Sequence, residues 1–126
     1  MASIASQGQE FTAFGYLGIC SALIFCNMGA AYGTAKSGVG ICSMGVLKPA
    51  QVLKSILPVI FSGVLAIYGI IIAVILQGNL ASADDTFPAN KGFKSLGAGL
   101  CCGLSSLAAG LAIGVVGDAG VRANGQ

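Results

Sequence analysis

The segment that decides the fold is residues 95–116, SLGAGLCCGLSSLAAGLAIGVV, which is uncharged and has Gly, Ala, Ser or Cys at 14 of its 22 positions. On a helix, its leucines form one bulky stripe and leave the remaining surface almost without side chains. A helix of this length and polarity can cross a bilayer, and its small residues let neighbouring helices lie very close. The segment therefore predicts a packed, all-α membrane protein. The stripe consists of Leu96, Leu100, Leu104, Leu107 and Leu111.

Composition agrees with a membrane protein and excludes several other classes. The chain has 126 residues, of which 56% are hydrophobic and 8% charged, and its mean hydropathy is +0.90. These values lie outside the range of soluble domains. The absence of His argues against a metal or hydrolytic site, and a net charge of +2 is too small for nucleic-acid binding. We therefore expect no cofactor, no metal and no soluble enzyme.

Three apolar spans are expected in a single domain, residues 1–126. They cover residues 11–35, 56–76 and 94–117. Residues 36–54 are expected to form a loop and the start of the second helix, residues 77–93 a second loop, and residues 118–126 a C-terminal tail. Pro49 suits a first helical turn, and Pro58 should kink the second helix. The first ten residues carry no Lys or Arg, so the first span is expected to be retained rather than cleaved as a secretory signal.

The basic residues predict the orientation. The side with the first loop and the C-terminus carries four Lys or Arg, and the other side carries two. The positive-inside rule then places the first loop in the cytosol and the N-terminus and second loop in the lumen. The lysines of the first loop are explained by this topology, and contact with a cytosolic subunit is the alternative.

The three spans differ in the size of their side chains, and we call a span rich in small residues smooth and one rich in large residues bulky. The first and third are rich in small residues, whereas the second is rich in Ile, Val and Leu. The motif GAAYG at residues 29–33 resembles GLAIG at residues 110–114, which suggests a repeated hairpin of one smooth and one bulky helix. Such a repeat implies four helices, and three are present. The residues expected to pack helices closely are Gly18, Ala22, Cys26, Gly29, Gly33, Gly99, Gly103, Gly110 and Gly114.

A closed ring of such hairpins would place slim helices on its inner circle, because that circle has less circumference per helix. Helices one and three would then line the inside, and helix two would face outward. The leucine stripe of the third helix is expected to pack outward against bulky helices.

Several polar residues have a structural and a functional interpretation. The five cysteines are expected to be packing residues, with a disulfide framework or metal site as the alternative. Asn27 is expected to make an interhelical hydrogen bond, with a proton or water contact as the alternative. Asp118 and Arg122 are expected to form a structural pair between residues i and i+4, with Asp118 as a transport acid as the alternative. Ser62, Ser105 and Ser106 are interpreted as packing residues and not as nucleophiles.

Several motifs resemble one known family in order and spacing: residues 28–38 (MGAAYGTAKSG), 54–59 (KSILPV), 66–69 (AIYG), 96–100 (LGAGL), 107–110 (LAAG) and 112–122 (AIGVVGDAGVR). Together they resemble the proteolipid (c) subunit of the vacuolar-type proton ATPase. The resemblance implies a rotor ring of copies of this chain and related proteolipids, which turns against a stator (a) subunit. It also implies a cytosolic coupling subunit, transported protons, contact with membrane lipid, and a vacuolar or other acidic endomembrane. ATP hydrolysis would occur in a separate soluble sector, since no hydrolytic site is expected in this chain.

Proton transport in such a ring needs a carboxyl group near the middle of the bilayer. Its neutral form can face lipid at a low free-energy cost, whereas its charged form cannot. The resemblance places that carboxylate in a fourth helix, which would follow residue 126. The second helix aligns with that segment as residues 61–69 (FSGVLAIYG), and Gly63 occupies the place of the acid. The resemblance also puts Tyr68 near a proton site, and membrane anchoring is the alternative.

The expected function is therefore a proton-translocating rotor-ring proteolipid. The alternatives are a truncated or structural ring component that cannot itself carry protons, and an unrelated small membrane protein.

Overall fold

The computed structural model describes residues 2–82 and 89–126, with side chains from residue 9 to 82 and from residue 90 onward, and every regular element in these ranges is helical. Helix α1 covers Ala2–Leu47, α2 covers Leu57–Ala81, and α3 covers Ala89–Gly125. Two short 3₁₀ turns, η1 (Pro49–Gln51) and η2 (Lys54–Ile56), lie between α1 and α2. The expected all-α class is confirmed.

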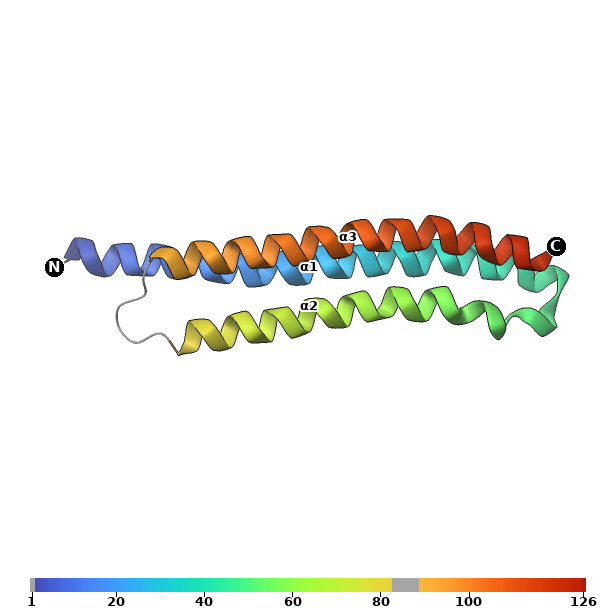
Figure 1. The fold of residues 1–126 in the computed structure, drawn as a ribbon, viewed down its shortest axis with the longest axis horizontal. Helices are drawn as coiled ribbons and strands as arrows, with labels where there is room; N and C mark the ends of the chain where they lie inside the picture. Colours follow the sequence, from blue (N-terminus) through green and yellow to red (C-terminus); the bar gives the residue numbers. More distant parts are fainter. Residues whose placement is uncertain (1, 83–88) are drawn as a thin grey trace.

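The helices form one elongated bundle (Figure 1). Helices α1 and α3 run side by side in the same direction, and α2 runs back along them in the opposite direction. We call the end that holds η1, η2 and the C-terminus the turn end, and the opposite end, near the N-terminus, the loop end. The most extensive contact joins α1 to α3, and α2 touches α1 more than it touches α3. The two smooth helices therefore pair directly, with the bulky helix beside them.

Three segments of the described chain are long and apolar enough to cross a membrane. They are Gln9–Leu47, Lys54–Ala81 and Asn90–Gly125, which contain 18-residue windows with mean hydropathies of 1.6, 2.8 and 2.0. An α-helix of 46 residues is about 70 Å long, which is more than twice the ~30 Å of a hydrocarbon core. Part of α1 must therefore lie outside the bilayer core, and the boundaries expected for each span remain predictions.

The connection after α1 is shorter than the sequence suggested. Residues 36–47 were expected to be loop, but α1 continues to Leu47, and α3 likewise includes residues expected in the C-terminal tail. A single lysine at position 36 is tolerated on an exposed helix face, so it does not end the helix. Helix α1 ends before Pro49 because a proline disfavours helical backbone angles in the preceding residue. That residue, Lys48, has φ −140° and ψ 80°.

Pro58 sets the start of α2 and does not kink it. Proline has no N–H and its ring clashes with the carbonyl four residues earlier, so it kinks or ends an α-helix that precedes it. The chain responds with a 3₁₀ turn at Lys54–Ile56, and α2 begins at Leu57 with Pro58 in its first turn. The expected internal kink was wrong because the helix adapts before the proline, whereas Pro49 does open a helical turn, as expected.

Candidate functional site

The contact between α1 and α3 is built from residues with almost no side chain. Buried positions recur every three or four residues along α3, as expected for one helical face. Eight of these nine positions hold Gly or Ser, so the backbone itself is the contact surface of α3. They are Gly92, Ser95, Gly99, Gly103, Ser106, Gly110, Gly114, Gly117 and Val121.

The closest contacts join equivalent residues of the two repeated segments. A methyl group built on Gly99 would overlap the backbone of Gly18, and one built on Gly110 would overlap the backbone of Gly29. A methyl group on Gly114 would lie 3.3 Å from Cα of Gly33. These three pairs have the same separation along the chain, so the two copies of the repeat meet in register and at equal height. At Gly99 and Gly110 only glycine permits this approach, whereas a methyl group on Gly114 would require its neighbours to shift by a few tenths of an ångström.

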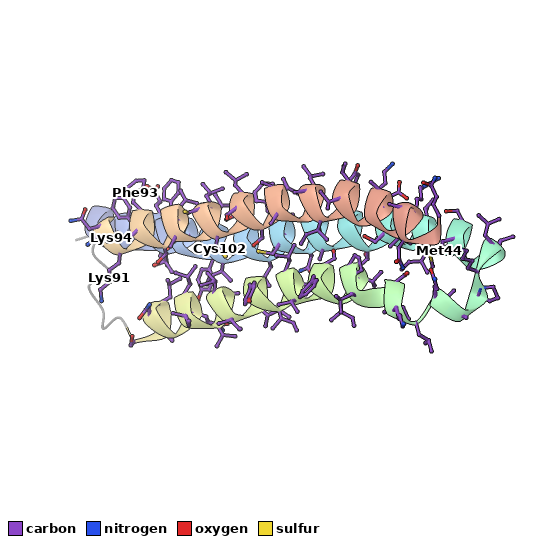
Figure 2. The ribbon with its side chains drawn as sticks, turned by 45° about the vertical axis from the view of Figure 1, so that its right-hand side comes forward. Met44, Lys91, Phe93, Lys94 and Cys102 are labelled. Atoms are coloured by element: carbon purple, nitrogen blue, oxygen red, sulfur yellow. The ribbon has the colours of Figure 1, made fainter. Side chains whose placement is uncertain are left out.

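Larger side chains complete the α1–α3 contact at both ends. At the loop end, Phe93 of α3 stacks on Phe14 of α1 with ring centroids 5.2 Å apart, and it meets Phe11 edge-on at 6.0 Å. At the turn end, a methyl group on Gly125 would lie 2.7 Å from Cγ of Met44, which is buried. Phe93 and Met44 lie near opposite ends of the bundle (Figure 2).

Helix α2 attaches to α1 through small residues of its own. The Ser62 hydroxyl is fully buried and donates a hydrogen bond of 2.8 Å to the carbonyl of Ala30. Gly69 lies against Cys26, since a methyl group there would be 2.6 Å from Cβ of Cys26. The rest of this helix carries large apolar side chains that are more than 45% exposed: Ile60, Phe61, Ile67, Tyr68, Ile70, Ile71, Val74 and Ile75.

All nine residues expected to pack helices closely lie in these contacts. Gly18, Gly29, Gly33, Gly99, Gly103, Gly110 and Gly114 lie between α1 and α3, and Ala22 and Cys26 face Gly69 of α2. Gly33 also contacts Ser62, so α1 meets both partners there.

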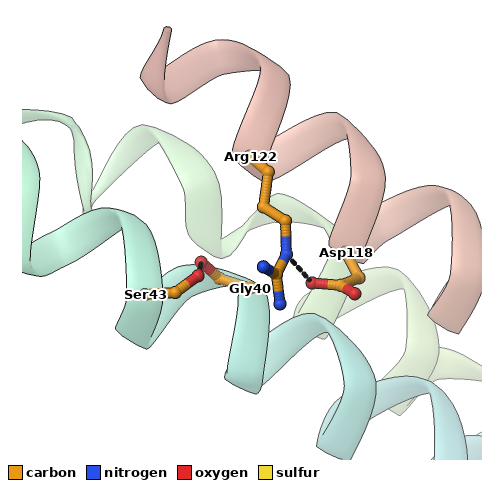
Figure 3. Close-up of polar contacts among 4 residues, drawn as sticks. All are labelled: Gly40, Ser43, Asp118 and Arg122. Atoms are coloured by element: carbon orange, nitrogen blue, oxygen red, sulfur yellow. Dashed lines mark hydrogen bonds and ion pairs between the residues drawn. The ribbon is translucent and has the colours of Figure 1, made fainter.

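The expected pair at the end of α3 is confirmed. Nε of Arg122 lies 2.8 Å from Oδ1 of Asp118, one helical turn away (Figure 3). Asp118 rests over Gly40 of α1, where a methyl group would be 2.6 Å from the carboxylate oxygen Oδ1. The carboxylate thus lies between the Arg122 guanidinium group and the backbone of α1 at Gly40, which is consistent with a structural role.

Three other expectations need correction or refinement. The Asn27 amide donates within its own helix, to the carbonyl of Leu23 at 2.8 Å, so the expected interhelical bond was wrong. The reason is geometric: Asn27 lies on the exposed side of α1 and points away from both partners. All five cysteines are free thiols, and Cys26 alone of them is buried. Ser106 is buried in the α1–α3 contact as expected of a packing residue, and Ser105 is exposed.

The leucine stripe of α3 does not pack on α2. The residues of α3 that face α2 include Ile113, Val116 and Gly120, each one position before a buried residue. The leucines fall one position after a buried residue, which is about 100° around the helix on the other side of the α1 contact. Leu104 and Leu111 are 52% and 44% exposed. Within this chain, the expectation that the stripe meets a bulky helix was wrong.

The acidic residues and the proposed proton-site residues occupy separate places. Glu10 is exposed in the first turns of α1, and Asp118 lies in the last turns of α3, while Asp84 and Asp85 fall outside the described residues. Gly63 is exposed on α2, and a methyl group there would meet no atom within 4 Å. Tyr68 is 53% exposed and lines a groove between α2 and α3. The described residues therefore bring no carboxylate to the Tyr68 hydroxyl.

Comparison with known proteins agrees with these features. Residues 17–76 match the family model of the ATP synthase C subunit. The chain is 58% identical over 113 residues to a V-type proton ATPase 16 kDa proteolipid subunit of Caenorhabditis elegans, covering 90% of this chain and 70% of that one. It is 50% identical over all 126 residues to the V-type proton ATPase 16 kDa proteolipid subunit of Rattus norvegicus, covering 79% of the rat chain.

This chain belongs to the V-type proton ATPase proteolipid family. A relative from Dictyostelium discoideum, named V-type proton ATPase proteolipid subunit, is 58% identical over 113 residues, covering 90% of this chain and 57% of its own length. With three apolar spans and such relatives, the protein is an integral membrane protein. The groove between α2 and α3 is the feature of the site that sequence analysis missed, because it arises from two helices that touch only weakly.

Proposed function

We propose that this chain is a proteolipid subunit of the membrane rotor ring of a vacuolar-type ATPase, where it takes part in proton translocation. The observation that carries the proposal is the in-register glycine contact between α1 and α3, in a chain whose relatives are named V-type proton ATPase proteolipid subunits. The ring acidifies an internal compartment, and this chain itself hydrolyses nothing.

The geometry of the bundle suits a ring with two layers. The pair α1 and α3 is slim, since its buried face is mostly Gly, Ala and Ser, and slim helices fit the shorter inner circumference. Helix α2 carries its large apolar side chains on its exposed surface, which suits contact with lipid or with other bulky helices. We therefore place α1 and α3 on the inner wall and α2 on the outside.

Proton carriage needs a carboxyl group at mid-bilayer, protonated where it faces lipid and ionised beside a polar path in the stator. Within α2 the aligned position is Gly63, which has no titratable group. Tyr68 lies near the middle of α2, and its hydroxyl can donate a hydrogen bond to such a carboxylate supplied by the assembled ring.

The partners follow from the same proposal. Copies of this chain and related proteolipids form the ring, and a stator subunit faces the outer layer. The turn end, with Lys36, Lys48 and Lys54 exposed, faces the cytosol and a coupling subunit there. The assembly resides in a vacuolar or other acidic endomembrane.

The test uses the protein purified from its native membrane in a gentle detergent. Native mass spectrometry should find it in a multi-subunit ring, and a carboxyl-reactive carbodiimide should label a membrane carboxyl of the ring and stop proton pumping in reconstituted vesicles. A monomer would refute the ring. A ring that contains this chain but pumps equally well after complete labelling would refute its part in proton transport and leave a structural role.

A further inference from the structure

Two cysteines from different helices meet inside the bundle. Cys26 of α1 is fully buried, and its Sγ lies 3.9 Å from the carbonyl oxygen of Cys102 of α3. The two thiols also lie within hydrogen-bonding reach of each other. Figure 2 shows Cys102 on α3, between the two ends of the bundle. Two thiols that are 76 residues apart in the chain are therefore neighbours across the contact between α1 and α3.

The glycine contacts hold the backbones of α1 and α3 together on both sides of this pair. Before the two cysteines, backbone touches backbone at Gly18 and Gly99. After them, it does so again at Gly29 and Gly110. A disulfide needs Cα atoms about 4.4–6.8 Å apart, whereas the axes of packed helices are usually about 8–10 Å apart. The glycine contacts bring these two helices closer than that, toward the range that a disulfide needs.

The surroundings of the pair favour a neutral product. Gly69 of α2 lies against Cys26, since a methyl group there would be 3.1 Å from Sγ. The Cys26 thiol is therefore enclosed by all three helices. A metal ion would need deprotonated thiolates, whose charge is costly in apolar surroundings. A disulfide carries no charge, so it is the modification that this place accommodates.

The other three cysteines do not share these surroundings. Cys20, Cys42 and Cys101 are exposed at the surface of the bundle. Cys101 directly precedes Cys102, but successive residues of a helix point about 100° apart. The exposed thiols therefore serve as references for the buried pair.

We propose that Cys26 and Cys102 are a modification site, at which hydrogen peroxide converts the two thiols into a reversible disulfide between α1 and α3. Hydrogen peroxide first transfers an oxygen atom to the sulfur of Cys102, the less buried of the two, giving a sulfenic acid and one water. The sulfur of Cys26 then attacks the Cys102 sulfur, so that the S–S bond forms as the S–O bond breaks. The hydroxyl group leaves with the thiol proton of Cys26 as a second water. The two thiols thus lose two electrons, and one peroxide is reduced to two waters.

The oxidation is slow, because the thiolate is the reactive form of cysteine and apolar surroundings disfavour it. The disulfide therefore records prolonged exposure to oxidant, and a dithiol reductant reverses it. Once formed, it ties together α1 and α3 at their closest contact. The inference rests on that contact, and it depends neither on proton carriage nor on assembly into a ring.

The experiment uses the protein purified from its native membrane in a gentle detergent. Hydrogen peroxide is applied for about tenfold longer than the exposed Cys20 thiol takes to react, because the buried site reacts more slowly. The protein is then denatured, its remaining thiols are alkylated, and digestion without reductant is followed by peptide mass spectrometry. We expect peptides joined through Cys26 and Cys102, about tenfold more abundant than any other cysteine pair and separated by dithiothreitol. If Cys26 is still a free thiol, or if another cysteine pair is as abundant, the proposal is overturned.

A matched pair of cysteine variants identifies the partner of Cys26. Cys102→Ser should abolish the disulfide, whereas Cys101→Ser, at the adjacent exposed thiol, should leave its yield unchanged. Loss of the disulfide in the Cys101→Ser protein, or a Cys26 disulfide that persists in the Cys102→Ser protein, would overturn the assignment.

A second pair of variants tests whether the disulfide arises from the close contact of α1 and α3. Gly99→Ala should lower its yield about fivefold, because the methyl group overlaps the backbone of Gly18 and separates the helices. Gly97→Ala, where a methyl group meets no atom within 4 Å, should not change the yield. An unchanged yield in a folded Gly99→Ala protein would contradict the origin of the pair in this contact.

Discussion

The contact between α1 and α3 differs from the contact of α2 with its neighbours in the kind of atoms that form it. Between α1 and α3, backbone meets backbone, and at Gly29 and Gly110 there is no room for one methyl group. Between α2 and α3, side chains meet and leave a groove of about 880 Å³. Close packing in a membrane depends on shape and not on the hydrophobic effect, because lipid is as apolar as the protein. The first contact therefore sets the architecture, and the second is looser.

The largest effect is expected from Gly110→Ala. The added methyl group overlaps the backbone of Gly29, which cannot rotate away as a side chain can, so the free energy of unfolding should fall by about 3 kcal/mol. The measurement is the midpoint of unfolding in a titration with denaturing detergent. Gly97→Ala on the same helix is the control, since a methyl group there meets no atom within 4 Å. Equal destabilisation by both variants would contradict the difference between the two contacts.

A smaller effect is expected from Gly69→Ala at the contact between α2 and α1. The methyl group would lie 2.6 Å from Cβ of Cys26, and the looser surroundings of α2 allow that helix to shift outward. We expect a loss of about 1 kcal/mol in the same titration. Gly63→Ala on the same helix should leave stability unchanged or raise it by up to about 1 kcal/mol, since alanine favours helix. A loss at Gly69 as large as that at Gly110 would show that α2 is held as tightly as α3.

A still smaller effect is expected from Ser62→Ala, which removes the hydrogen bond to the Ala30 carbonyl. Interhelical hydrogen bonds in membranes contribute about 0.6 kcal/mol on average, and that is the expected decrease in unfolding free energy. Ser105→Ala, at an exposed serine of α3, should change nothing measurable. A loss above about 2 kcal/mol would mean that α2 depends on this one bond and not on its shape.

The smallest effect is expected from Arg122→Gln. The arginine side chain is 53% exposed and the pair lies within one helix, so its loss should lower stability by no more than about 0.5 kcal/mol. Raising the salt concentration should reduce the difference further, since salt screens exposed charges. A large effect that persists in high salt would show that the ion pair keeps Asp118 in contact with Gly40 and so holds α3 against α1.

The sequence predicted the class, the three spans, the smooth and bulky textures and the internal repeat, because each is a property of one segment. Helix boundaries were predicted less well, since Lys36 looked like the start of a loop but is accommodated on an exposed helix face. Gly18, Ala22 and Cys26, three of the residues expected to pack helices closely, lie at every fourth position in α1. Four residues turn about 400°, so such a stripe drifts about 40° per step. It accordingly moves from α3 at Gly18 toward α2 at Cys26, which contacts Gly69 of α2 and still reaches the Cys102 carbonyl of α3.

Features that depend on two helices together could not be predicted from one segment. The in-register pairing of Gly18 with Gly99 and of Gly29 with Gly110 requires the relative height of α1 and α3. The orientation of the leucine stripe and the groove at Lys54 depend on how α1, α2 and α3 pack together. Gly117 and Gly120 line the groove, but glycine near a helix end is common and does not by itself indicate a groove.

The most direct test of the account is a cryo-electron microscopy map of the assembly purified from its native membrane, at a resolution that separates the helices. We predict α1 and α3 side by side on the inner wall, with the backbones of Gly29 and Gly110 in contact, and α2 in the outer layer. A map with α2 on the inner wall, or with a side-chain layer between Gly29 and Gly110, would contradict it.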